Sequence, residues 1–144
     1  EIRCAIGVAN LSRLGITIKQ RLRFIQCLIN EFKKLQIHLF YPSEFHDGLS
    51  PFYYPLFVNT ERTTSTVSRI SQSLKDDGLG IGVKYGCLVS TWNWACSYMF
   101  DDFVSTNALK TRDRCFHLYL NENYTPRHAR LIARRLKYWE SVYT

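Results

Sequence analysis

Residues 74–94 read LKDDGLGIGVKYGCLVSTWNW, and this stretch organises the rest of the chain. Gly78 stands where a helix would end through a left-handed residue, a conformation that is easy for glycine. Apolar residues then alternate with glycines, as expected of a strand with one packed face: Leu79, Gly80, Ile81, Gly82 and Val83. The stretch therefore predicts a helix end, a strand over 79–85 and an irregular aromatic loop that carries Trp92 and Trp94.

The glycines admit two interpretations. A glycine face on a strand allows another backbone, or a large ligand, to approach closely. A glycine-rich phosphate loop normally connects a strand to a helix, whereas Gly78, Gly80 and Gly82 lie before or within the expected strand. Structural glycines are the favoured interpretation, and a phosphate cradle is the alternative.

Periodicity outlines the other elements. Apolar spacing predicts helices over 2–14 and 18–32, which are two helices or one long helix bent at Gly15. Further helices are expected over 64–77, 105–113 and from Pro126, with Thr125 as the N-cap. Strands are expected over 37–41, 52–59 and 115–120, and Pro55 predicts that the second of these is an edge strand or carries a bulge.

These elements predict an α+β fold, in which helices cover a small antiparallel or mixed sheet. The length of 144 residues and the 46% hydrophobic content favour a packed domain. No apolar run approaches the ~20 residues of a membrane helix, and no secretory signal is visible. A cytoplasmic protein is expected. Because the chain opens with glutamate, a processed protein or a piece of a longer one is expected.

The net charge of +7 attracts anions but does not choose among them. A solvated basic surface, a phosphate-bearing small ligand and nucleic acid are all compatible with it. Trp92, Trp94 and Tyr98 have rings that could stack on a base, but buried or interface aromatics are the more common use. The basic helix that closes the chain could lie on nucleic acid, but a plain solvated helix face is the favoured interpretation.

The reactive side chains form no recognisable motif. The five cysteines and four histidines show neither metal-ligand spacing nor paired-cysteine spacing, so a zinc site is not expected and a reducing compartment is. The adjacent pairs Asp76–Asp77 and Asp101–Asp102 do not face each other as catalytic carboxylates would. The residues alone therefore contain no catalytic centre.

The ordered segments do resemble a known family. They are EIRCAIGVANLSRL at 1–14, IKQRLRFIQCLINEF at 18–32, FYYPLFVN at 52–59, SLKDDGLGIGVKYG at 73–86 and NALKTRDRCFHLYLNENYTPRHARLIARRL at 107–136. In this order they resemble the DegT/StrS family of pyridoxal-phosphate-dependent sugar aminotransferases. The resemblance implies the C-terminal, small domain of a fold-type I enzyme, with linking helices at 1–35 and a small α+β domain at 36–144.

What the resemblance implies about function is specific. The whole protein would transfer an amino group from an amino-acid donor to a keto sugar, commonly nucleotide-linked, and would be a homodimer. Its catalytic lysine and its pyridoxal phosphate would belong to a large domain before Glu1. This chain alone would then be inactive and without cofactor. An independent binding module for nucleic acid or an anionic ligand is the alternative.

The resemblance also assigns candidate substrate contacts. Tyr85 matches the tyrosine at the family's substrate mouth, and Lys84 precedes it. Trp92 and Trp94 fall where the family's loop continues toward the active site. The family's proline and histidine after the tyrosine are replaced here by Gly86-Cys87. This departure leaves open a keto substrate other than a nucleotide sugar.

Overall fold

The computed structural model describes residues 2–43, 48, 50–59, 64–86, 88–98 and 105–143. The element order is α1 (Ile2–Lys34), β1 (Phe40–Pro42), β2 (Tyr53–Val58), α2 (Thr64–Asp76), β3 (Ile81–Gly82), the 3-10 turns η1 (Val89–Thr91) and η2 (Cys96–Tyr98), α3 (Thr106–Asp113), β4 (Cys115–Tyr119) and α4 (Pro126–Tyr143). Among the residues of the sequence predictions, 60–63, Cys87 and Asp101–Asp102 lie outside the described ones.

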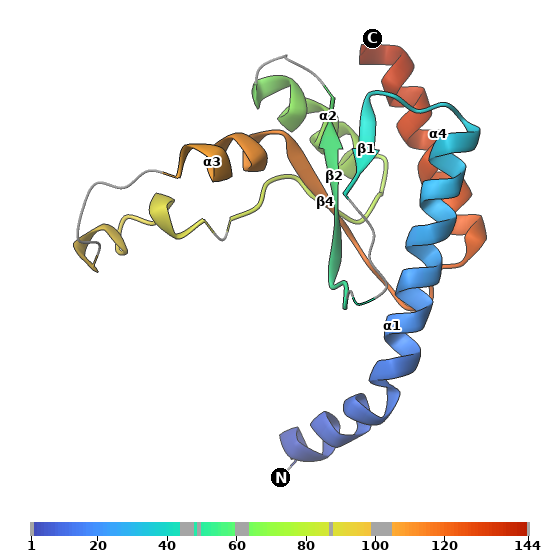
Figure 1. The fold of residues 1–144 in the computed structure, drawn as a ribbon, viewed down its shortest axis with the longest axis vertical. Helices are drawn as coiled ribbons and strands as arrows, with labels where there is room; N and C mark the ends of the chain where they lie inside the picture. Colours follow the sequence, from blue (N-terminus) through green and yellow to red (C-terminus); the bar gives the residue numbers. More distant parts are fainter. Residues whose placement is uncertain are drawn as a thin grey trace.

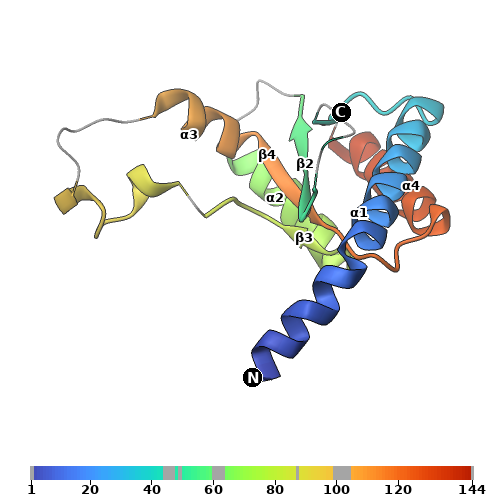
Figure 2. The same cartoon turned by 60° about the horizontal axis from the view of Figure 1, so that its bottom comes forward.

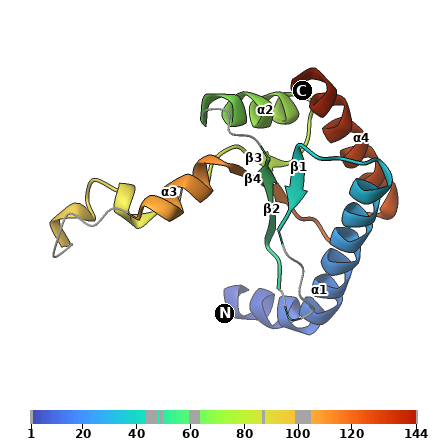
Figure 3. The same cartoon turned by 45° about the horizontal axis from the view of Figure 1, so that its top comes forward.

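The strands form one antiparallel sheet in the order β1-β2-β4-β3. Helices α1, α2 and α4 gather on one side of this sheet (Figure 3). The α+β class is therefore confirmed, and of the two predicted sheet types the antiparallel one is present. No helix among the described residues has the length and hydropathy that crossing a membrane requires.

Successive side chains of β2 and β4 point to opposite faces of the sheet, and one of these faces packs against the helices to form the core. Tyr54, Leu56 and Val58 of β2 are buried under the helices, together with Phe116 and Leu118 of β4. The helices contribute their inner faces to the same cluster: Phe24, Ile25, Leu28 and Phe32 of α1; Val67, Ile70 and Leu74 of α2; and Ala129, Ile132, Ala133 and Leu136 of α4. The other sheet face carries the remaining residues of the two strands, and this is where the candidate site lies.

The prediction for Pro55 was wrong, because β2 is a central strand that pairs with both β1 and β4. Toward β4, Val58 donates its N–H to the carbonyl of Arg114. Bonding sides alternate along a strand, so the nitrogen of Pro55 faces the β1 side. There β1 has already ended at Pro42, and the Pro55 carbonyl accepts the N–H of Ser43. A proline fits this central strand because its neighbour is only three residues long.

Helix α1 is a single element, which decides between the two predicted arrangements. It continues through Gly15 and curves toward its amino end (Figure 1). Its buried residues all lie at Phe24 or later, and this carboxyl half packs beside α4. The amino half extends beyond the sheet (Figure 2) and leaves large apolar side chains exposed: Ile2, Ile6, Val8, Leu11, Leu14 and Ile16.

In residues 74–94 the predicted helix end is present, but the predicted strand is shorter than expected. Gly78 has φ +85°, so the left-handed helix stop is confirmed. The strand β3 spans only Ile81–Gly82 rather than 79–85. The space beside Gly82 is filled by Tyr119, whose Oη lies 2.9 Å from where a Cβ on Gly82 would stand. A side chain of the neighbouring strand, rather than a ligand, makes use of this glycine.

Residues 88–98 and α3 form an arm that leaves the sheet on the side opposite the helices (Figure 1, Figure 3). The arm starts after Tyr85 and returns to the sheet through α3, which leads directly into β4. Within it, the rings of Trp92 and Trp94 stack with centroids 5.3 Å apart. The base of the arm, where it joins the sheet, forms the walls of a cavity.

Candidate functional site

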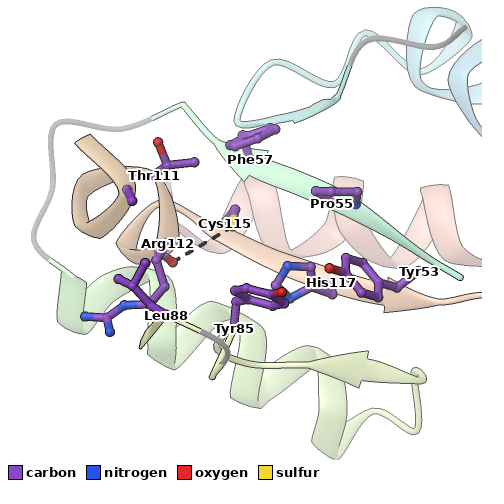
Figure 4. A pocket seen from close by; sticks show the side chains of 10 residues that line it. Tyr53, Pro55, Phe57, Tyr85, Leu88, Thr111, Arg112, Cys115 and His117 are labelled. Atoms are coloured by element: carbon purple, nitrogen blue, oxygen red, sulfur yellow. Dashed lines mark hydrogen bonds between the residues drawn. The ribbon is translucent and has the colours of Figure 1, made fainter. Parts of the chain in front are cut away.

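A cavity of about 380 Å³ lies on the sheet face that the helices leave uncovered, a volume in the range of small-molecule sites. Its floor is the outer face of the two central strands, and its walls are the two ends of the arm (Figure 4). Ten residues line it: Tyr53, Pro55 and Phe57 of β2; Cys115 and His117 of β4; Ala108, Thr111 and Arg112 of α3; and Tyr85 and Leu88.

The strand register brings these residues together. Tyr53, Pro55 and Phe57 alternate with the core residues of β2, so they project to the opposite face. In β4, His117 pairs with Pro55, and Cys115 pairs with Phe57. Figure 4 shows Tyr85 beside His117, with Tyr53 on the other side of the imidazole. Side chains that are far apart in the sequence therefore share one surface.

Burial sets the charge states of two lining residues of β4, His117 and Cys115. Burial lowers the pKa of His117 below its ordinary value, although a hydrogen bond with the Gly82 backbone acts in the opposite direction. Burial, together with the negative charge of Asp113, raises the pKa of the Cys115 thiol. At neutral pH the imidazole is therefore uncharged and the thiol protonated, so Cys115 is no activated nucleophile.

The four residues assigned by resemblance lie in different environments. Tyr85 lines the cavity. Lys84 is directed to Asp113, with Nζ 3.5 Å from Oδ1, and so joins the segment before the arm to the end of α3. Trp92 donates its indole N–H to the carbonyl of Gly86 at 2.9 Å, and Trp94 is exposed on the arm. The structure thus brings Tyr85 into the cavity wall, while the other three lie outside the lining.

Several lining residues were not found from the sequence, above all Tyr53, Cys115 and His117. Their common signal is alternation, because each is two residues from another outward-facing position on its strand. The sequence contains that signal but not the register that pairs β2 with β4. Without the register, the histidine remained one of four scattered histidines.

The lining does not fit pyridoxal phosphate by itself. The cofactor needs a lysine amine, a carboxylate for its ring nitrogen and several donors for its phosphate. Among the described residues that line the cavity, none is Lys, Asp or Glu. Arg112, the cation of the described lining, has its Nε 3.2 Å from Oδ1 of Asp113. Likewise, the described residues include no cluster of three or more potential metal ligands.

The profile of the DegT/DnrJ/EryC1/StrS aminotransferase family matches residues 1–137. The chain belongs to this family. The resemblance described above is therefore confirmed, and the family places the fold among aminotransferase domains. A comparison with curated proteins finds no match.

Solved structures of aminotransferases share the fold at low sequence identity. The PMP form of "Putative sugar aminotransferase Spr1654" from Streptococcus pneumoniae superposes with a TM-score of 0.79 at 14% identity, covering 96% of this chain and 34% of that one. For 3-amino-5-hydroxybenzoic acid synthase the TM-score is 0.71 at 15% identity, with 93% and 37% covered. The aminotransferase TlmJ from Streptoalloteichus hindustanus superposes with a TM-score of 0.72 at 14% identity, covering 96% of this chain and 36% of that one. The chain thus spans about a third of the length of each aminotransferase.

Proposed function

We propose that this chain is the C-terminal, small domain of a pyridoxal-phosphate-dependent aminotransferase that transfers an amino group from an amino-acid donor to a cyclic keto substrate. The observation that carries the proposal is the cavity on the uncovered sheet face. Its wall holds Tyr85. By resemblance, Tyr85 matches the family's substrate-mouth tyrosine. Family membership and the share of the neighbours' length that the chain covers support the division into domains.

The division of labour follows from the chemistry of the cavity. Because the described lining provides no amine or carboxylate, the cofactor and the catalytic lysine would be held by the large domain. This chain would contribute the wall that receives the keto substrate. In this arrangement Tyr85 is the substrate contact that the geometry supports best. Lys84 would affect substrate binding indirectly, through its ion pair with Asp113. Trp92 and Trp94 lie on the arm, outside the cavity lining, and would contact the substrate from there.

The surroundings of the protein are part of the same proposal. We place it in the cytoplasm, where a reducing environment keeps thiols free. Cys4, Cys27 and Cys115 are free cysteines among the described residues, in agreement with this placement. The whole protein would work as a homodimer on a small-molecule substrate, for which a nucleotide-linked keto sugar is the family's usual choice.

The test uses the full-length protein that carries this chain, purified with pyridoxal phosphate. We expect a Schiff-base absorbance band that borohydride removes, and amino transfer from glutamate to a keto substrate. Tyr85→Ala should lower kcat/KM for the keto substrate about ten-fold or more and leave the band unchanged, because Tyr85 contacts substrate rather than cofactor. Tyr138→Ala, on the exposed side of α4, is the matched control and should change neither. A protein without the band would overturn the proposal.

An independent nucleic-acid module is the alternative, and the structure offers it less support. Two cations of the closing helix are paired, Arg135 with Asp77 and Lys137 with Glu140. The rings of Trp92 and Trp94 stack on each other. Oligonucleotide binding that weakens steeply with salt would favour this alternative, since phosphate contacts release counterions.

A further inference from the structure

Three aromatic rings from three segments meet at one end of the cavity, where Tyr53 and His117 of the floor stand beside Tyr85. The ring centroids of Tyr53 and His117 lie 4.7 Å apart, those of Tyr85 and His117 lie 5.2 Å apart, and those of Tyr53 and Tyr85 lie 6.1 Å apart. The interplanar angles of 75°, 54° and 51° are edge-to-face or tilted, so the rings brace one another. We call Tyr53, Tyr85 and His117 the aromatic wall (Figure 4).

The surfaces opposite and beneath the aromatic wall are mostly apolar. Pro55 and Cys115 lie on the floor, and Leu88 and Ala108 are further apolar residues of the lining. The hydrogen-bonding side chains are few: two phenols, one imidazole, the hydroxyl of Thr111 and the guanidinium of Arg112, whose Nε is already bonded to Asp113. A ring that carries a hydroxyl on nearly every carbon would leave several of them without partners in this cavity, which is unfavourable for binding.

The described lining contains one charged side chain, Arg112, and its floor is uncharged. His117 is neutral at pH 7 because burial lowers its pKa, and the Cys115 thiol stays protonated. Arg112 has its Nε against the carboxylate of Asp113, and Figure 4 shows its guanidinium turned away from the floor. The part of a ligand that rests on the floor is therefore best uncharged.

We propose that the cavity binds an uncharged, flat and sparsely hydroxylated six-membered ring, which stacks against the aromatic wall. Flat rings gain the most from aromatic contact, and the phenols and the imidazole can bond one or two ring oxygens. That this ring is the ring of the keto substrate rests on the proposed function. The binding preference itself rests on the cavity alone. A nucleotide-linked, polyhydroxylated sugar is then not the substrate that this wall selects.

The test compares two uncharged six-membered rings as probes, phenol and methyl β-D-glucopyranoside. Each is added separately to the full-length protein, and binding is followed by saturation-transfer NMR and titration. We expect saturation transfer to phenol and none to the glucoside at equal concentration. Tyr53→Ala should weaken phenol binding about five-fold, because Tyr53 lies on the outer face and contributes a ring to the wall without belonging to the core.

The control variant is Tyr138→Ala, which removes an exposed tyrosine from α4 and should leave phenol binding unchanged. The proposal is overturned if the glucoside binds as well as phenol, or if Tyr53→Ala leaves phenol binding intact. The Schiff-base band is a separate readout of the same protein. Phenol binding that depends on Tyr53, in a protein without the band, would keep the ring site and reject the aminotransferase assignment. A band without phenol binding would do the reverse.

Discussion

At the scale of single residues, a buried carboxylate of α4 holds the chain where α1 passes into β1. One oxygen of Glu140 accepts the backbone N–H groups of His38 and Leu39, each at 2.6 Å. The other lies 2.6 Å from Nζ of Lys137, which also donates to the carbonyl of Gln36. Glu140 is 5% exposed, so these partners replace water that it lost on folding. The loop after α1 is thereby fixed by a residue 101 positions later.

This arrangement predicts a pH-dependent contribution to stability. Burial raises the pKa of Glu140, but the hydrogen bonds from Lys137, Leu39 and His38 outweigh it and hold the pKa below its ordinary value. A carboxyl whose pKa is lower in the folded state stabilises above its unfolded pKa, about 4.3, and loses this contribution as pH falls through the folded value. Glu140→Gln should therefore cost about 1–3 kcal/mol at pH 7 and progressively less below pH 4.

Urea unfolding of the protein at pH 7 and pH 3 measures this difference, with hydrogen exchange of residues 36–42 as a local readout. Glu31→Gln, on the half-buried part of α1, is a control that should change stability by less than about 0.5 kcal/mol at either pH. A cost for Glu140→Gln that is equal at the two pH values would mean that shape, and not charge, is what Glu140 supplies.

At the scale of elements, two glycines with open surroundings should respond in opposite ways to alanine. Gly78 ends α2 with φ +85°, while Leu79 N–H bonds the Leu74 carbonyl and Gly78 N–H bonds the Lys75 carbonyl. Gly15 lies inside α1, and a Cβ at either glycine would meet no atom within 4 Å. Gly78→Ala should destabilise by about 1 kcal/mol through its backbone, and Gly15→Ala should stabilise by about 0.5–1 kcal/mol through helix propensity.

Thermal unfolding of the two single variants checks both signs. Because neither methyl group meets a neighbour in the described structure, packing within this chain does not explain a difference between the two variants. Two variants that shift the midpoint in the same direction would show that backbone conformation does not decide these positions.

The same elements show what the sequence could and could not predict. Local signals were sufficient to predict the end of α2 and the start of α4. The left-handed Gly78 ends α2. Pro126 begins α4 after Thr125, whose N–H bonds His128 Nδ1. Strand positions depended on partners that local signals do not contain. Pro55 tolerates a central strand because β1 stops early, and β3 is short although its alternation runs further.

The cavity illustrates this limit most clearly. Tyr85 was found only because it matches a family motif, whereas Tyr53 and His117 join it through the pairing of β2 with β4 and of β3 with β4. Pairing between strands about 60 residues apart is a property of the folded chain, and no spacing rule within one strand reveals it.

At the scale of the whole molecule, the amino half of α1 carries exposed large apolar side chains on more than one side, with polar residues such as Arg3 and Arg13 between them. Ile6 and Val8, for example, lie about 200° apart around a helix of 3.6 residues per turn, and they are 56% and 68% exposed. A surface helix keeps its apolar residues on one side, and a helix that is apolar all round is normally buried. We infer that, in the proposed aminotransferase, the large domain and the second subunit cover this half from more than one side.

This inference separates two leucines that are both exposed in the described structure. Leu11 of α1 is 69% exposed and Leu131 of α4 is 52% exposed. Two exposed leucines should tolerate alanine equally, within about 0.5 kcal/mol. If the rest of the full-length protein covers the amino half of α1, Leu11→Ala opens a cavity there and should cost about 2–4 kcal/mol, while Leu131→Ala remains neutral. Denaturant unfolding of the two full-length variants measures the contrast, and equal small effects would mean that the amino half of α1 stays in water.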